Sequence, residues 1–448
     1  MTDARARLEQ SIWPVVLVLA ALVIVAVPEL GSDPWAFVPG AIEPSGPLAW
    51  LVRIADSEWD EGLLRACALL GGVLVAVAAL VALRVDRWRA WVAIALTAVV
   101  VALITVPGVL LQVGLRDSSE PWFFTNDSTY QIELAGDLVL DGKNPYGHDY
   151  SSSGLERFYS LDGTVSPATK EEQVALSHFA YFPGTVYTAA AWRLLPSPFD
   201  DYRLFVLLCT LGLLGAALAF PGPLPWRLAA GALLAANPLA ARAAWFGVAD
   251  APSILLVVLA FALCARSRFV AAAACVAGAA AEHDHGADEG HGDERELLEQ
   301  DRSRRELCTA TAVFGSILLA GFLPFLIADA RALYDDTIAY GADTYRIIGY
   351  GIAGILVETG IIEERTDPYP FALLATLVWL PATAWLVWNH LRSREPWTAA
   401  AGFALSSFIL LYIGRVLQNS YLVWPLAGAT VAVLLALGAR AGRDARAG

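Results

Sequence analysis

The segment WVAIALTAVVVALITVPGVLLQV, residues 91–113, contains no charged residue. It is long enough to cross a bilayer as a helix, since a transmembrane helix requires about 20 mostly apolar residues. Similar runs recur along the 448-residue chain, which is 57% hydrophobic and has a mean hydropathy of +0.54. Soluble domains contain roughly 45–50% apolar residues. We therefore expect an all-α integral membrane protein, a multi-pass transmembrane helical bundle.

These apolar runs predict about 12 membrane spans. Their continuous composition is unlike a transmembrane β-barrel, whose strands are short segments of alternating hydrophobicity. The candidate spans are residues 12–27, 63–83, 91–113, 179–195, 204–220, 226–241, 251–264, 269–281, 307–327, 371–388, 398–413 and 421–437. The first run lacks a small-residue cleavage site, which favours a retained span over a signal peptide.

The arginine distribution predicts the orientation, because cytoplasmic loops of membrane proteins carry an excess of Lys and Arg. The arginines concerned are Arg5, Arg7, Arg84, Arg87, Arg89, Arg392, Arg394, Arg440, Arg443 and Arg446. Placing all of them in the cytoplasm gives a cell-membrane protein with both termini inside. The loops 31–61, 116–177 and 328–370 then face outside. Between residues 241 and 306 one crossing could be re-entrant or absent, because run 269–281 is short for a span.

The charge balance limits the partners. The net charge is −14, and the lysines are Lys143 and Lys170. This pattern is typical of proteins from salt-loving archaea, and the absence of a basic stripe argues against nucleic acid as a partner. The five cysteines form no CxxC pair and lie in or beside apolar runs, so we interpret them as buried thiols.

Residues 282–305 form an acidic, His-rich segment that we expect to be a cytoplasmic loop. Its His283, Asp284, His285 and His291 could ligate zinc. The alternative is a solvated, glycine-rich loop without a metal. We favour the second interpretation and expect no metal site, although a need for a divalent cation stays open.

The stretch FFTNDSTYQIELAGDLVLDGKNPYGHDY, residues 123–150, is polar and follows a predicted span. Gly142 and Pro145 end a helical pattern here. We expect a short amphipathic helix over residues 128–141 that lies along the membrane surface. Its apolar stripe is formed by Tyr130, Leu134 and Leu138, with Ile132, Ala135 and Val139 beside it. Asp127 is then either the cap of this helix or a functional carboxylate.

Several short motifs follow one another in a fixed order. They are Asp127, Tyr130, Gly142-Lys143-Asn144-Pro145-Tyr146, Tyr181-Phe182-Pro183, Asn237-Pro238, Phe246-Gly247-Val248-Ala249-Asp250, Tyr345-Arg346, Gly349-Tyr350-Gly351 and Arg415 through Pro425. In this order they resemble the GT-C membrane glycosyltransferases, and among these glycosyltransferase family 87, whose members use polyprenyl-phosphate mannose. The similarity runs from about Trp91 to Leu437, and the order of the motifs is more specific than any one of them.

The resemblance also implies a domain division. Residues 1–90 would add two N-terminal spans to a GT-C-like core over residues 91–440, followed by a cytoplasmic tail over residues 441–448. Residues 116–177 would form the catalytic loop, which follows the third span of this chain. Gly247-Val248 stands where the family often has Gly-Gln.

The resemblance implies transfer of a sugar, with mannose as the expected sugar, from a polyprenyl or dolichyl phosphate to an extracytoplasmic glycan, lipid or protein, with inversion. Asp127 would be the general base, a role worth roughly 10²–10⁴-fold in rate. Arg415, or else Arg346, would bind the departing phosphate. The other substrate-binding residues would be Tyr130, Asn144, Tyr146, Tyr181, Gln418 and Asn419. No cofactor is expected.

Two other interpretations stay open. A transporter or flippase would use the same apolar helices, with Asp250 and Arg415 along its pathway. Inverted repeats would favour that interpretation, and none is apparent in the sequence. A catalytically inactive relative of the GT-C enzymes could instead serve as a membrane partner. Asp250 should face a cavity or cap a helix in any of these cases, because a carboxylate facing lipid is costly.

The orientation is testable with one new cysteine at Ser152→Cys. We expect a membrane-impermeant maleimide to label it in intact cells, because Ser152 lies in the loop placed outside. Labelling that requires broken membranes would contradict the predicted orientation.

Overall fold

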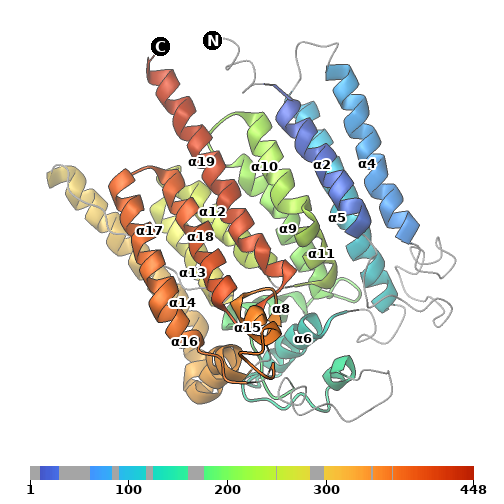
Figure 1. Cartoon of the computed structure of the whole chain (residues 1–448), viewed down its shortest axis with the longest axis vertical. Helices are drawn as coiled ribbons and strands as arrows, with labels where there is room; N and C mark the ends of the chain where they lie inside the picture. The colour runs from blue at the N-terminus through green and yellow to red at the C-terminus, as the bar shows by residue number, and fades with distance from the viewer. Residues whose placement is uncertain are drawn as a thin grey trace. The chain divides into compact units, whose positions relative to one another are not determined.

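Figure 1 shows the computed structural model, which describes residues 11–29, 61–82, 90–117, 125–159, 176–248, 250–282, 297–344, 347–365 and 367–447. The described part is mainly helical, and its strands are β1 (Ile348–Gly349) and β2 (Val416–Leu417), which pair in parallel. The predicted all-α class is therefore confirmed. The chain divides into unit 1 (Met1–Thr125, Leu195–Val258 and Thr430–Gly448) and unit 2 (Asn126–Leu194 and Leu259–Ala429). The division at residue 90 stays a prediction.

Unit 1 is a group of packed helices. They are α2 (Trp13–Glu29), α4 (Glu61–Ala82), α5 (Ala90–Asp117), α9 (Tyr202–Leu218), α10 (Leu224–Ala236), α11 (Pro238–Phe246), the start of α12 (Asp250–Cys264) and the end of α19 (Val423–Ala447). Helix α10 packs against α2, α5 and α9. At Gly231 a Cβ atom would lie 2.7 Å from the Leu214 side chain, so a glycine at this position lets α9 and α10 approach closely.

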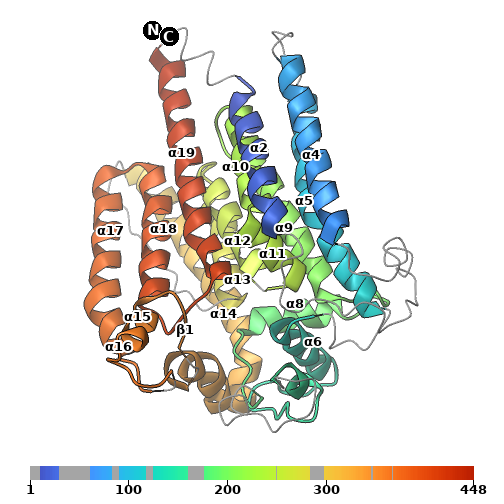
Figure 2. The same cartoon turned by 45° about the vertical axis from the view of Figure 1, so that its right-hand side comes forward.

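Unit 2 contains the polar segments. Its other elements are α6 (Asp127–Leu140), η2 (Leu155–Tyr159), α8 (Pro183–Trp192), α13 (Phe269–Glu282), α14 (Leu297–Tyr334), η3 (Asp335–Thr344), α15 (Ile352–Glu358), α16 (Phe371–Leu374), η4 (Ala375–Trp379), α17 (Leu380–Ser393), α18 (Pro396–Ile413) and η5 (Asn419–Leu422). Figures 1 and 2 show α6, α8 and α15 at one end of this unit, and the turn between α17 and α18 at the other end.

Six described helices are long and apolar enough to cross a membrane, so the predicted 12 spans are not confirmed. The six are Arg65–Ala82, Ala90–Gly114, Arg305–Gly341, Phe371–Ser393, Pro396–Ile413 and Asn419–Ala441. Five more apolar helices are shorter. The predicted span 179–195 contains only the ten-residue α8, about 15 Å long and thus half of the hydrocarbon thickness.

The predicted number of spans is too high because the hydropathy of a segment does not show where a helix begins or ends. Pro183 starts α8, and the four residues before it are not helical. Asn237 ends α10 and also caps α11, so the apolar run 226–241 becomes two short helices. Helix α14 begins at Leu297, inside the segment 282–305 that was expected to be a loop; residues 283–296, with His283, Asp284, His285 and His291, lie outside the described residues.

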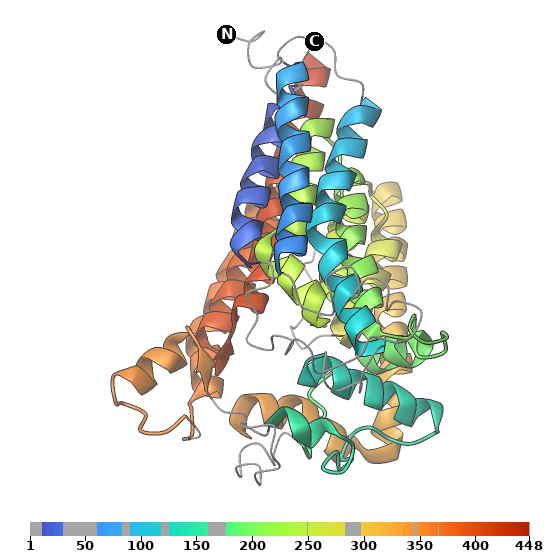
Figure 3. The ribbon, with the colours of Figure 1, turned by 90° about the vertical axis from the view of Figure 1, so that its right-hand side faces the viewer.

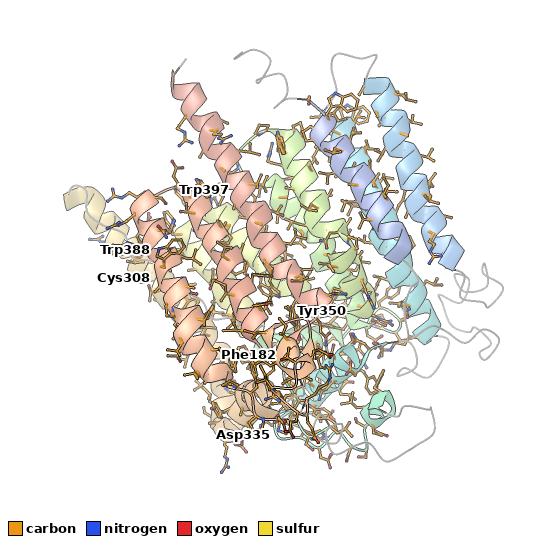
Figure 4. The ribbon with its side chains drawn as sticks, in the orientation of Figure 1. Phe182, Cys308, Asp335, Tyr350, Trp388 and Trp397 are labelled. Carbon is orange, nitrogen blue, oxygen red and sulfur yellow. The ribbon has the colours of Figure 1, made fainter. Side chains whose placement is uncertain are left out.

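The surface of the long helices indicates a membrane-embedded protein. Leu319 and Ile327 on α14 are 57% and 76% exposed, and Leu377 on η4 is 65% exposed. Large apolar patches are unfavourable on a surface that faces water, whereas the same side chains can face lipid without this cost in free energy. Trp388 and Trp397, labelled in Figure 4, are exposed on α17 and α18, as expected of aromatic residues near a membrane interface.

Helix α6 confirms the short helix predicted over residues 128–141. Asn126 caps it by accepting a 2.7 Å hydrogen bond from the Thr129 N–H, and Gly142, with φ of 72°, follows its C-terminal end. Figures 2 and 3 show that α6 lies across the direction of the long helices of unit 2. Its position relative to a membrane surface stays a prediction.

The buried side of α6 matches the predicted apolar side only in part, at Ile132 and Ala135. The buried residues are Thr129, Gln131, Ile132, Glu133, Ala135 and Gly136, whereas Tyr130, Leu134 and Leu138 are only half-buried. The physical reason is the contact with α8, because a Cβ atom on Gly136 would lie 2.9 Å from the Ala190 nitrogen. The close approach of the two backbones therefore decides which side of α6 is covered.

Gly136→Ala should destabilise the protein. The added methyl group would push α6 from α8, and overpacking costs about 1–3 kcal/mol, more than the roughly 1 kcal/mol that alanine contributes within a helix. We expect a lower midpoint of thermal unfolding in detergent. Gly315→Ala in α14 is the matched control, because its Cβ atom would contact nothing. Equal midpoints for the two variants would contradict the packing described here.

Candidate functional site

Asp127 is the first residue of α6 and is half-buried. Its Oδ1 atom accepts a hydrogen bond from the Ser128 N–H at 2.9 Å. The cap of this helix is the neighbouring Asn126, so capping does not require Asp127. The positive end of the helix dipole favours the ionised form of a carboxylate at this position. Asp127 is thus placed where an ionised carboxylate is stabilised without serving as the cap.

The motif residues that follow Asp127 stabilise the fold of the polar loop, which we define as residues 125–159 and 176–182. The Tyr130 hydroxyl donates to the Ser153 carbonyl at 2.8 Å. The Asn144 Oδ1 atom accepts from the Tyr146 N–H at 3.2 Å, a side-chain turn typical of Asn. These two motif residues make hydrogen bonds inside the loop.

Tyr146 is buried, with 3% of its surface exposed. Its hydroxyl donates to the Tyr181 carbonyl at 2.8 Å, and its ring makes edge contacts with Phe179 and Phe325. Burial raises the pKa of the Tyr146 hydroxyl well above its ordinary value, so this group remains a donor. In this conformation Tyr146 has no ring face available for a sugar. Tyr181 itself is half-buried.

Arg415 follows α18 and is buried, with 3% of its surface exposed. Its Nη2 atom donates to the Asp367 carbonyl at 3.3 Å. Beside it, burial raises the pKa of Tyr369 to about 12 against the opposing effect of the Arg415 charge, and the Tyr369 hydroxyl donates to the Ile413 carbonyl at 2.6 Å. Arg415 is therefore packed inside the polar end of unit 2 and does not extend into solvent.

The Gly349-Tyr350-Gly351 motif is explained by the pairing of β1 with β2. Gly349 has φ of 98°, and a Cβ atom there would collide with the Leu417 carbonyl. A Cβ atom on Gly351 would lie 2.7 Å from the Tyr412 oxygen. Two glycines thus let the backbone of residues 347–351 approach the end of α18. Tyr350, labelled in Figure 4, is exposed between them.

Three predicted substrate-binding residues remain: Gln418, Asn419 and Arg346. Gln418 and Asn419 are exposed at the start of η5. Arg346 lies outside the described residues. Figures 2 and 3 show α6 and the strand pair at the same end of unit 2 but well separated within it. The structure therefore does not gather the predicted base and the predicted phosphate ligand at one point.

Asp336 was missed by the sequence analysis. It lies on the π-helix η3, with 2% of its surface exposed. Its Oδ2 atom accepts hydrogen bonds from the N–H groups of Gly147 at 2.8 Å and Phe179 at 3.3 Å. A polar pair, Asp335-Asp336, that follows a long apolar run was the available signal. Buried carboxylates and π-helical turns are both frequent at functional sites.

Aromatic and hydrogen-bonding groups surround Asp336. The His178 ring stacks on Tyr340 with centroids 4.7 Å apart. Burial raises the pKa of the Asp336 carboxyl above its ordinary value, and the hydrogen bonds from Gly147 and Phe179 oppose this rise. The Tyr150 hydroxyl donates to the Pro145 carbonyl at 2.9 Å. The buried carboxylate is thus the point at which η3 contacts both parts of the polar loop.

Two other carboxylates, Asp250 and Asp201, are also buried. Asp250 begins α12 and is buried, so it does not face lipid. In unit 1, Asp201 is buried in a cluster with Arg203 and Arg116; burial opposes its ionisation, but the two guanidiniums hold the pKa of Asp201 below its ordinary value. Among the described residues no group of three or more His, Cys, Asp or Glu could hold a metal ion.

No protein-family model, curated protein or solved structure matches this chain. The resemblance to family 87 therefore depends on the order of the motifs and on the residues within them.

Tyr146→Phe tests the structural role of this motif residue. The change removes the donor to the Tyr181 carbonyl, and loss of a buried hydrogen bond costs about 1–3 kcal/mol. We expect a lower midpoint of thermal unfolding. Tyr350→Phe is the control, because the Tyr350 side chain is 66% exposed. A midpoint of Tyr146→Phe equal to that of the control would show that the bond contributes nothing.

Proposed function

We propose that this protein is a membrane glycosyltransferase of the GT-C type. It transfers a sugar, mannose in our proposal, from a polyprenyl or dolichyl phosphate to an extracytoplasmic glycan, lipid or protein. Asp127 takes the proton of the acceptor hydroxyl, whose oxygen attacks the anomeric carbon. The bond from that carbon to the phosphate oxygen breaks, and the lipid phosphate leaves with inversion at the sugar.

The observation that carries this proposal is the position of Asp127. It occupies the first turn of an ordered polar helix, beside a residue that already caps the helix. A carboxylate in the first turn of this helix can act as a general base toward an acceptor hydroxyl. The same polar loop contains the Gly142–Tyr146 motif and leads into the Tyr181–Pro183 motif, in the order that the family has them.

In the proposal the departing phosphate is bound by Arg415, or by Arg346. An arginine suits this role because its fork of N–H donors matches phosphate oxygens. Strand β2, which begins directly after Arg415, lies at the same end of unit 2 as α6. The exposed Gln418 and Asn419, which follow Arg415 by a few residues, would bind the sugar or the lipid phosphate from the same segment.

Asp127→Asn tests the base. Asparagine cannot take the proton, so we expect transfer to fall by roughly 10²–10⁴-fold. Thermal stability should stay unchanged, since Asn126 provides the cap. The assay follows transfer from a radiolabelled polyprenyl-phosphate mannose in reconstituted membranes.

Asn126→Ala is the matched control for this experiment. It removes the cap, at a cost of about 1 kcal/mol, and leaves the carboxylate, so stability should fall while transfer persists. Wild-type turnover by Asp127→Asn would exclude Asp127 as the base. Asp137, another acid on α6, forms an ion pair with Arg193 at 3.0 Å. If the wild-type protein transfers no sugar but moves the lipid across the bilayer, it is a flippase.

A further inference from the structure

We propose that Asp336 is the positioning residue of the polar loop, and that its carboxylate sets the orientation of α6 and hence of Asp127. The loop-fixing part of this inference stands on geometry, and its catalytic consequence rests on the proposed function. Asp336 does not touch the substrate in this scheme. It acts through the backbone of the polar loop.

The first step is the double hydrogen bond. Gly147 and Phe179 belong to parts of the polar loop that are distant in sequence, and both donate their N–H groups to one oxygen of Asp336. Hydrogen bonds to a carboxylate are stronger than those between neutral groups. Asp336 therefore fastens both parts of the loop to η3. Its burial excludes water, which would otherwise compete for the same N–H groups.

The second step leads from Phe179 to α6. The Gln131 Nε2 atom donates to the carbonyl of His178, the neighbour of Phe179, at 2.7 Å. Gln131 is buried on α6 and lies four residues after Asp127, so the two side chains occupy the same side of the helix. The bond from Gln131 thus joins this side of α6 to the segment that Asp336 holds, and together with the backbone contact at Gly136 it orients the helix that carries Asp127.

The third step leads from Gly147 to the Tyr181-Phe182-Pro183 motif at the start of α8. Tyr146 precedes Gly147, and its hydroxyl donates to the Tyr181 carbonyl. The segment 144–147 and the entry to α8 are therefore held together twice, once through Tyr146 and once through Asp336. Loss of the carboxylate would remove both hydrogen bonds to η3, while the bond from Tyr146 and the stacking of His178 on Tyr340 would stay in place.

Asp336→Ala tests the inference with a readout that needs no substrate. Hydrogen–deuterium exchange of the full chain in detergent should be about tenfold faster in peptides that cover residues 145–150 and 177–182, because two N–H groups lose their acceptor. In the transfer assay kcat should fall, while the KM for the lipid-linked donor should stay unchanged.

Three further variants complete the test. Asp336→Asn keeps an oxygen that can accept both N–H groups, so it should restore slow exchange and most of the turnover. Asp335→Ala is the matched control: Asp335, labelled in Figure 4, is half-exposed and pairs with Arg331, so its loss should change neither readout. Gln131→Leu breaks the second step alone and should lower kcat with slow exchange retained at residues 145–150.

Unchanged exchange in Asp336→Ala would overturn the inference, and so would fast exchange with wild-type kcat. If Asp336→Ala does not fold, a wild-type kcat for Gln131→Leu would overturn the inference equally. Fast exchange in Asp336→Ala, combined with no sugar transfer by the wild-type protein, would reject the proposed function and leave Asp336 as the residue that fixes the loop.

Discussion

Inside a bilayer a backbone N–H or C=O group has no water to bond with, and this constraint determines most of the structure. Helices satisfy these groups within one segment. The long apolar segments of the described chain are accordingly helical, and these helices expose leucine and isoleucine side chains. Irregular backbone is concentrated in unit 2 between α6 and α8 and around the two short strands.

At the polar end of unit 2, side chains replace regular structure as partners of the backbone. Asp336 accepts from two N–H groups of the polar loop, and Tyr146 donates to the Tyr181 carbonyl. Around the strand pair, Tyr369 donates to Ile413 and Arg415 to Asp367. Each of these side chains is buried or nearly so. Their common role is to hold irregular backbone in one conformation, which a site for chemistry beside a membrane requires.

The motif residues fall into two groups under this description. Tyr146, Asn144 and Gly349 are explained by the fold, because each makes or permits a close backbone contact. Asp127 is not explained by capping, since Asn126 has that role. Motif residues that are needed for folding can recur in proteins with different activities, so the functional proposal depends most on Asp127.

Much of the local structure followed from the sequence. The apolar runs predicted membrane helices because helix formation and burial in lipid depend mainly on local composition. The bounds of α6 were predicted to within a residue, since polar residues at its start and Gly142 at its end act on their own neighbourhood. Asn237-Pro238 could have predicted the end of one helix and the start of the next. The run 226–241 was instead counted as one span, although it forms two short helices.

Only the tertiary structure decided which side of a helix is buried and which groups a polar side chain bonds. Periodicity placed Tyr130, Leu134 and Leu138 on the covered side of α6, but the backbone contact at Gly136 turned Gln131 and Glu133 inward. Asp336 could not be identified because its partners, Gly147 and Phe179, are far from it in the chain. The sequence by itself determined a helical membrane protein with a polar segment beside its spans. The environment of each side chain in that segment required the fold, because burial and hydrogen bonding depend on residues that the chain brings together only when it is packed.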